Sequence, residues 1–117
     1  MPTDPRDLLP LAPHDFQVLL ALAEAPRHAY GLSQAVDDEG GVRLEIGSLY
    51  RILSRLTDAG VIEDFDPPAD AAGHEARRRY YRLTAFGRRV AGAEAERLAG
   101  ALRLARRHRL LPSKGPR

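Results

Sequence analysis

A short stretch in the middle of this 117-residue chain places residue types that contact nucleic acids at a regular helical spacing. Residues 46–56 read Ile-Gly-Ser-Leu-Tyr-Arg-Ile-Leu-Ser-Arg-Leu, and Gly60 follows as a helix terminator. The apolar side chains fall on one face of the predicted helix, namely Leu49, Ile52, Leu53 and Leu56. The other faces carry the polar candidates Ser48, Tyr50, Arg51 and Arg55. This pattern predicts an anchored helix whose polar side chains remain available for a ligand.

The first turns of such a helix are suited to DNA. Arg51 can read guanine through two parallel hydrogen bonds, whereas Ser48 and the Tyr50 hydroxyl are expected to fix the register on the phosphate backbone. The exposed N–H groups at the helix start also suit a phosphate. Two alternatives remain open: Tyr50 as a structural tyrosine wedged between helices, and Arg55 as either a phosphate contact or a salt-bridge residue.

Three consecutive arginines, Arg77, Arg78 and Arg79, form the strongest run of charge. They begin a predicted strand, so they cannot all face the same way. We expect one to pair with Asp64 or Glu63 across a hairpin and the others to contact the minor groove or the phosphates. A solvated strand end is the alternative.

His28 and Tyr30 stand at the start of another predicted helix and are further phosphate candidates. Packing of Tyr30 in the core fits its position equally well.

Helical and strand patterns surround these segments. A helix is predicted from Pro13 until Pro26 stops it, with a buried stripe of Phe16, Leu19, Leu20 and Ala23. A second helix, residues 29–38, has Leu32, Ala35 and Val36 as its apolar face and Gly40-Gly41 as its terminator. Val42 and Leu44 alternate with charged residues and predict a short strand.

Two runs rich in strand-forming residues, 61–65 and 77–83, flank a turn-rich segment at 66–76 and predict a hairpin with a mobile tip. Within the second run, Tyr81 and Leu83 are two positions apart, so their side chains are expected on the same face of the strand, toward the core. Tyr80 and Arg82 are expected on the other face. Thr84 is the candidate N-cap of a last helix over residues 85–109.

That last helix is too long to be covered by a domain of this size. Small and apolar residues recur along it at intervals of 4, 3, 4 and 3, namely Ala91, Ala95, Leu98, Leu102 and Ala105. This heptad-like seam predicts packing against the first helix and against a second subunit. Gly92 and Gly100 weaken the helix, which makes an independent coiled coil unfavourable.

Composition limits the classes of protein. The chain has no cysteine, its longest apolar run spans only residues 18–23, and Asp4 and Asp7 stand where a signal peptide would be basic. We therefore expect a soluble cytoplasmic protein that does not contact membranes. Residues 1–70 hold five arginines against thirteen acidic residues, a net charge of −8, whereas residues 71–117 carry a net +10. Such polarity suggests a face that binds a polyanion.

Enzyme chemistry finds no support in the sequence. The four histidines, at positions 14, 28, 74 and 108, lack metal-ligand spacing, and the chain has neither a glycine-rich phosphate loop nor a nucleophile turn. We expect no catalytic residue, no metal and no cofactor.

The order helix, helix, short strand, helix, hairpin is the plan of a winged helix-turn-helix, mainly α with a small β-hairpin. Four segments, Arg27 to Leu32, Gly47 to Leu56, Gly60 to Ile62 and Arg79 to Gly87, resemble the PadR family of bacterial transcriptional regulators in order and spacing. Ala29 departs from the family, which usually has glycine there. We divide the chain into an arm (1–12), a winged helix-turn-helix domain (13–84), a dimerisation helix (85–110) and a disordered tail (111–117).

The resemblance implies a homodimer that binds double-stranded DNA and regulates transcription, most simply as a repressor. By analogy with relatives, a small apolar or aromatic effector would bind between subunits, near Leu8, Leu11 and Phe16. The alternative is a winged-helix adaptor that binds other proteins, because a fold does not fix a function. Arginines at both the central helix and the hairpin favour the DNA-binding interpretation.

Overall fold

The computed structural model describes residues 4–40, 43–67, 69–70, 73 and 78–112. Its elements in chain order are a 3-10 helix η1 (Pro5–Leu8), α1 (Pro13–Glu24), β1 (Arg27–His28), α2 (Ala29–Gly40), α3 (Ile46–Asp58), β2 (Ile62–Phe65), β3 (Tyr80–Leu83) and α4 (Ala85–Arg107). The predicted helices and the hairpin are all present. The terminator residue Gly41, most of the predicted hairpin tip and the tail from residue 113 lie outside the described residues.

The sheet has three antiparallel strands in the order β1-β3-β2, so β3 is central. Ile62 pairs with Leu83 and Asp64 with Tyr81, while Arg27 pairs with Tyr81 on the other edge. The short strand predicted around Val42 and Leu44 is not part of this sheet. Val42 lies outside the described residues, and residues 43–45 are not in a strand. Leu44 is buried as a loop residue instead, because its side chain fills the core between α2 and α3.

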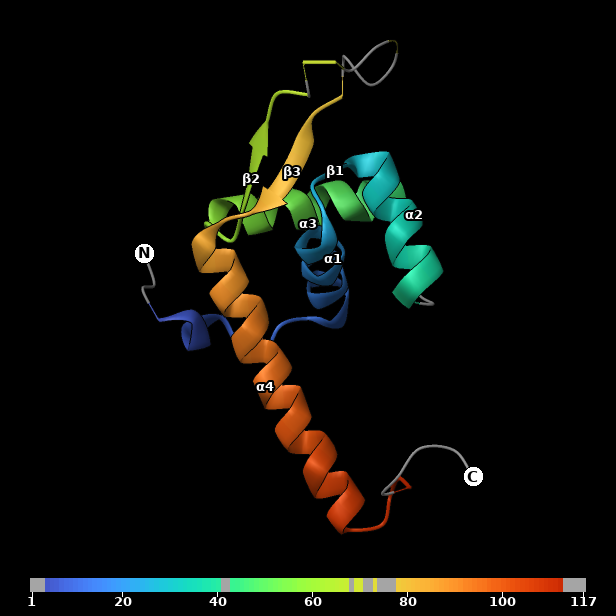
Figure 1. Cartoon of the computed structure of the whole chain (residues 1–117), viewed down its shortest axis with the longest axis vertical. Coiled ribbons are helices and arrows are strands. Elements are labelled where there is room, and N and C mark those ends of the chain that lie inside the picture. The colour runs from blue at the N-terminus through green and yellow to red at the C-terminus, as the bar shows by residue number, and fades with distance from the viewer. Residues whose placement is uncertain (1–3, 41–42, 68, 71–72, 74–77, 113–117) are drawn as a thin grey trace.

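The core lies where α1, α2 and α3 meet the sheet (Figure 1). The apolar faces predicted for α2 (Leu32, Ala35, Val36) and α3 (Leu49, Ile52, Leu53, Leu56) are buried. Tyr81 and Leu83 pack against this core, as the alternation of side chains along the strand predicts.

The buried face of α1 differs from the predicted one. The buried residues are Asp15, Val18, Ala21 and Leu22 together with the expected Leu19, whereas Leu20 is 45% exposed and Ala23 is exposed. Apolar residues occur on several sides of α1, so the spacing of apolar residues alone did not predict which side is buried. The ion pair of Asp15 with α3 helps to fix which side turns inward.

α4 begins against the sheet and its last turns project beyond the other helices, while η1 packs against its side (Figure 1). The Thr84 hydroxyl accepts a hydrogen bond from the Gly87 N–H, which confirms the predicted N-cap. Within the described parts of the chain, no helix has both the length and the apolar composition that a bilayer crossing requires.

A close approach joins the start of α4 to the end of α3. The Thr84 N–H donates to the Val61 carbonyl at 3.2 Å, and the Thr84 hydroxyl donates to the Gly60 carbonyl at 2.6 Å. One turn later, a Cβ added at Gly87 would lie 1.8 Å from the Val61 carbonyl oxygen. Only glycine lets the two backbones meet at this distance.

A buried carboxylate that the sequence analysis did not identify ties the N-terminal arm to α4. Glu94 is 2% exposed, and the Arg97 guanidinium donates to both of its oxygens at 2.8 Å. The hydrogen bonds from Arg97, together with one from the backbone N–H of Leu11, hold the pKa of Glu94 below its usual range.

Replacing Gly87 by alanine is expected to destabilise the fold by about 3 kcal/mol, because a methyl group cannot fit beside the Val61 carbonyl. Gly92 on the same helix has no atom within 4 Å of an added Cβ, so Gly92→Ala should stabilise by about 1 kcal/mol. Urea unfolding followed by circular dichroism measures the free energy of unfolding of both variants. Equal shifts in the same direction would contradict the close approach.

Glu94→Gln should lower the free energy of unfolding at pH 7 by about 2 kcal/mol, because the charged hydrogen bonds to Arg97 are lost. Since the folded state lowers the pKa of Glu94, its stabilisation is present above the ordinary pKa and is lost as the pH falls through the lowered value. Unfolding curves of wild type and variant should therefore converge at acidic pH. If the difference in free energy of unfolding between wild type and Glu94→Gln stays constant from pH 7 to acidic pH, the ionised Glu94 does not stabilise the fold in this way.

Candidate nucleic-acid interface

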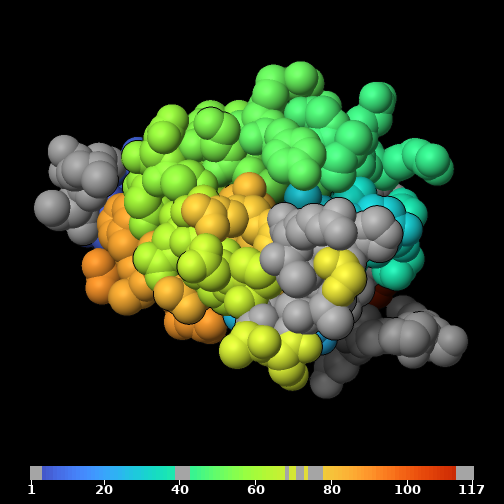
Figure 2. All heavy atoms as spheres, turned by 90° about the horizontal axis from the view of Figure 1, so that it is seen from above, coloured from blue at the N-terminus to red at the C-terminus, as the bar shows by residue number. Residues whose placement is uncertain are grey.

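The first turns of α2 and α3 and the hairpin of β2 and β3 lie together on one side of the molecule, which we call the α3–hairpin face. Seen from above, α3 and the hairpin run along this face, and α2 adjoins them (Figure 2). The last turns of α4 point away from it (Figure 1). The face therefore gathers the two segments that the sequence singled out.

An open pocket of about 500 Å³ lies on this face and is lined by His28, Ala29, Tyr30, Ile46, Tyr50, Arg78, Arg79 and Tyr81. Five of these are predicted DNA-binding residues, from three separate parts of the chain. Tyr81, Ile46 and Ala29 were not predicted for the site. Burial, with Tyr50 and Asp64 nearby, raises the pKa of Tyr81.

The start of α3 presents its polar residues to solvent. Tyr50 is 54% exposed, so it is not wedged between helices, and Arg51 is exposed with its guanidinium 3.1 Å from the Ser48 hydroxyl. Gly47, just before them, leaves the helix start open, since no atom lies within 4 Å of an added Cβ. The side chains of Tyr50 and Arg51 are therefore accessible from solvent.

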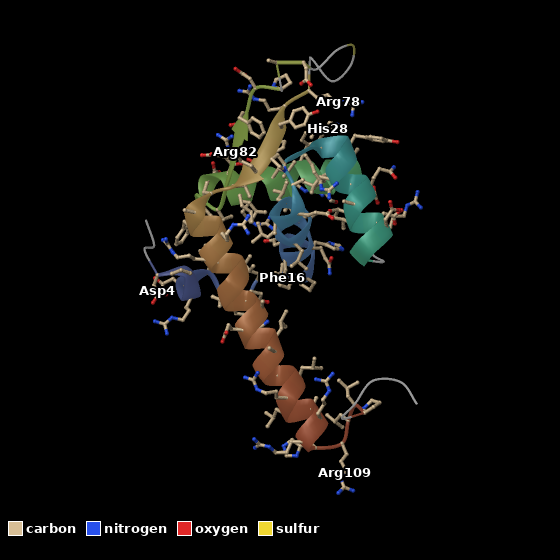
Figure 3. The ribbon with its side chains drawn as sticks, viewed as in Figure 1. Asp4, Phe16, His28, Arg78, Arg82 and Arg109 are labelled. Carbon is tan, nitrogen blue, oxygen red and sulfur yellow. The ribbon has the colours of Figure 1, made fainter. Side chains whose placement is uncertain are left out.

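His28 joins the sheet to the start of α2. Its Nδ1 accepts the Gly31 N–H at 3.0 Å and lies 3.2 Å from a guanidinium nitrogen of Arg78, while its ring meets Tyr80 edge-on. Arg78 also lies over the Tyr30 ring, 5.4 Å from its centroid. His28 and Arg78 approach each other at the top of the molecule, and Arg82 lies apart from them (Figure 3).

Two other hairpin arginines, Arg79 and Arg82, are paired with acids. Arg79 contacts Asp64 at 3.0 Å and Asp66 at 2.8 Å, which confirms the predicted cross-hairpin pairing. Arg82 contacts Glu63 at 2.8 Å. Arg77 lies outside the described residues.

Arg55 lies further along α3 and contacts Asp15 of α1 at 2.6 Å. Asp15 is buried, so this pair links two helices, and the salt-bridge alternative is the one that the structure shows. Sequence reasoning missed Asp15 because the pair spans 40 positions; its helical spacing with Val18, Leu19 and Leu22 was the available signal.

The predicted dimerisation residues divide into two groups. Ala91 is buried within its own chain, whereas Ala95, Leu98 and Leu102 are exposed and Ala105 is half-buried. The predicted effector residues Leu8, Leu11 and Phe16 are half-buried and pack against the core, with Phe16 on α1 (Figure 3).

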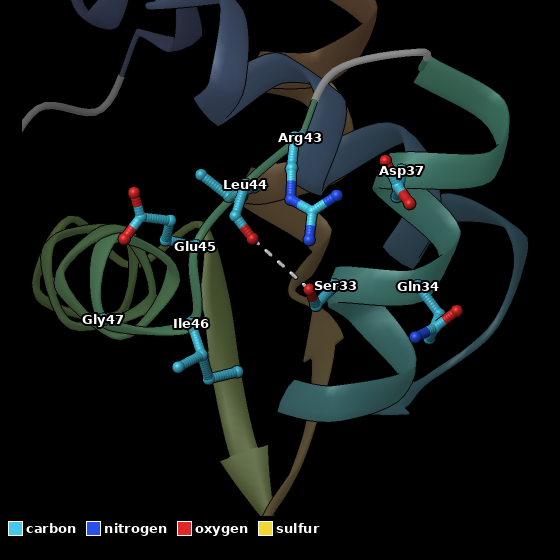
Figure 4. Close-up of a pocket in the computed structure, with 8 residues that line it drawn as sticks. All are labelled: Ser33, Gln34, Asp37, Arg43, Leu44, Glu45, Ile46 and Gly47. Atoms are coloured by element: carbon cyan, nitrogen blue, oxygen red, sulfur yellow. Dashed lines mark hydrogen bonds between the residues drawn. The ribbon is translucent and has the colours of Figure 1, made fainter.

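A second pocket of about 400 Å³ separates α2 from the start of α3 (Figure 4). Arg43, Asp37 and Glu45 line it, and the Ser33 hydroxyl donates to the Leu44 carbonyl across it at 3.4 Å. Its mixed charges indicate a solvated seam between two helices. In the described parts of the chain, no three His, Cys, Asp or Glu residues are placed to hold a metal ion.

A family model described as the transcriptional regulator PadR-like family matches residues 18–93, which include α2, α3, the hairpin and the start of α4. The chain belongs to this family. A relative, an uncharacterized 37.1 kDa protein in transposon Tn4556 of Streptomyces fradiae, is 34% identical over 82 residues. That match covers 70% of this chain and 22% of the relative, so the chain spans about a fifth of the relative's length.

Solved structures show the same fold. A PadR family transcription regulator from Clostridium difficile superposes with a TM-score of 0.70 at 18% identity, over 80% of this chain and 95% of the other. A transcriptional regulator from Clostridium thermocellum gives 0.66 at 23% identity, over 80% and 86%. These PadR-like and related neighbours confirm the winged helix-turn-helix architecture.

Arg55→Ala is expected to destabilise the fold by about 1–3 kcal/mol, because it leaves the buried Asp15 carboxylate without its partner. Arg51→Ala, a matched change one turn earlier on the exposed start of α3, should alter stability by less than about 0.5 kcal/mol. Thermal or urea unfolding at neutral pH compares the stabilities of the two variants with that of wild type. Equal stabilities would contradict a structural role for Arg55.

Proposed function

We propose that this PadR-like chain is a sequence-specific DNA-binding transcriptional regulator that acts as a homodimer in the cytoplasm. The observation that carries the proposal is the convergence of His28, Tyr30, Tyr50 and Arg78 at one pocket of the α3–hairpin face, beside the exposed Arg51. These residues come from elements that lie against DNA in winged helix-turn-helix proteins.

Each element has a distinct part in this proposal. α3 enters the major groove, where Arg51 reads a base edge and Ser48 and Tyr50 fix the position of the helix. Arg78, held over Tyr30 and beside His28, contacts a phosphate next to the groove. Phosphate contacts give attraction and register, while base contacts give sequence preference.

The exposed apolar side chains support a dimer. Leu98 and Leu102 on α4 are 40% and 39% exposed, and Leu20 on α1 is also exposed. A second copy packed along α4 would cover the seam of Ala95, Leu98, Leu102 and Ala105. It would also set two α3 helices at a fixed separation, which suits a palindromic operator.

Repression is the simplest outcome of such binding, because a dimer seated on its operator blocks the promoter. Release by an apolar or aromatic effector near Leu8, Leu11 and Phe16 stays a prediction. The adaptor hypothesis is the alternative, and the DNA-binding experiment below separates the two.

Purified protein should bind a labelled fragment of its own upstream region more tightly than scrambled DNA in a fluorescence anisotropy titration, with a dimer mass by light scattering. Arg51→Ala should weaken binding to the native fragment by about 1–3 kcal/mol and leave scrambled DNA unchanged. Arg78→Ala should weaken both alike and reduce the slope of log affinity against log salt by about 1.

Arg107→Ala removes the same charge from the far end of α4 and serves as the control, with affinity expected to match wild type. Equal, weak binding of wild type to both fragments would reject sequence-specific regulation and favour the adaptor hypothesis.

A further inference from the structure

The hairpin is not the basic arm that its run of arginines suggests. Residues 62–83 contain four arginines but five acidic residues. Their net charge is therefore −1, although the second part of the chain is strongly basic. A hairpin of this charge would not by itself attract a phosphate backbone.

Strand register explains how the charges cancel. Glu63 lies opposite Arg82 and Asp64 opposite Tyr81. Continued by two residues, this register sets Arg79 opposite Asp66, on the side of the hairpin that carries Asp64. A single guanidinium thus lies between two carboxylates, through Nε to Asp64 at 3.0 Å and Nη1 to Asp66 at 2.8 Å.

The neighbouring arginine has the opposite environment. Arg78 contacts an imidazole nitrogen of His28 and the ring of Tyr30, and no ion pair to Arg78 occurs among the described residues. Arg78 and Arg79 line the same pocket on the α3–hairpin face. One cation at this pocket is thus open to a phosphate, and the other already has two anionic partners.

The acidic character continues along the seam between α3 and the hairpin. A shallow pocket of about 250 Å³ there is lined by Asp58 and Asp64 together with Tyr50 and Tyr81. A phosphate in this seam would lie beside the carboxylates of Asp58 and Asp64. A duplex that is not seated by α3 therefore gains attraction from Arg78 but little from the part of the hairpin around Arg79.

We propose that Asp64 and Asp66 are specificity-determining residues: they withhold Arg79 from DNA phosphates until α3 has seated the duplex. The inference rests on the proposed DNA-binding function. In a correctly seated complex a phosphate replaces the carboxylates on Arg79. On unrelated DNA the ion pairs persist, so the hairpin adds no sequence-independent attraction from this residue.

The test is an anisotropy titration of the full chain against its native upstream fragment and scrambled DNA at several salt concentrations. Asp66 is 92% exposed, so Asp66→Asn frees the Nη1 side of the Arg79 guanidinium for a phosphate with little risk to folding, while Asp64 stays on Nε. It should raise affinity for scrambled DNA about fivefold at 0.15 M salt and steepen the salt slope by about 0.9, the contribution of one added phosphate contact. Affinity for the native fragment should rise less, so the ratio of the two affinities falls.

Three further variants sharpen the result. Asp66→Asn combined with Arg79→Gln should return scrambled-DNA affinity to the wild-type value. Arg79→Gln alone should weaken the native complex and leave scrambled DNA unchanged. Glu63→Gln makes the same change of charge but releases Arg82 on the opposite side of the hairpin, and it should leave the ratio of affinities as in wild type.

An unchanged affinity ratio in Asp66→Asn would overturn the proposal, as would equal weakening of both complexes by Arg79→Gln, because Arg79 would then already contact phosphate on any DNA. Wild-type protein that binds both fragments equally weakly, or neither of them, would reject the proposed function itself and this inference with it. The two failures are distinct, because the first requires that wild type prefers the native fragment, whereas in the second wild type shows no such preference.

Discussion

The arrangement of the whole molecule depends on the contact between Gly87 and the Val61 carbonyl. Val61 follows α3 and leads into β2, while Gly87 lies in the first turn of α4, directly after β3. The contact therefore fixes three elements at once: the helix that carries Arg51, the hairpin and the long helix that projects from the domain. Hydrogen bonds from Thr84 to Gly60 and Val61 hold the same junction closed. A small shift here would change the angle between α3 and α4, and with it the separation of the two α3 helices in the proposed dimer.

Arginines in this chain serve different purposes that depend on their partners. Arg55 and Arg97 bind buried carboxylates and hold helices or the arm in place. On the α3–hairpin face, Arg51 is exposed and Arg78 is half-buried, and neither forms an ion pair with a described residue. Arg79 is between these cases, exposed but already paired. The total charge of a segment is thus a poor guide to the field that a ligand meets.

Sequence reasoning succeeded where a local rule decided the outcome. The α3 face followed from helical spacing because its polar and apolar residues are cleanly separated, and the Thr84 cap followed from its position before a helical pattern. It failed where contacts between distant residues decided. α1 is apolar on several sides, β1 has only two residues, and the Arg55–Asp15 pair joins positions 40 apart. The gathering of His28, Tyr50 and Arg78 at one pocket likewise required the fold.

The central place of β3 in the sheet bears on how this family can diversify. β3 is held by β2 on one edge and by β1 on the other, so its register does not depend on the chain that connects Phe65 to Tyr80. Insertions and deletions in that connection cost little free energy, because the entropy of loop closure changes only slowly with loop length. Their length can therefore drift between homologues, changing how far the hairpin reaches along a duplex, while Tyr81, Leu83 and the α3 helix keep their positions.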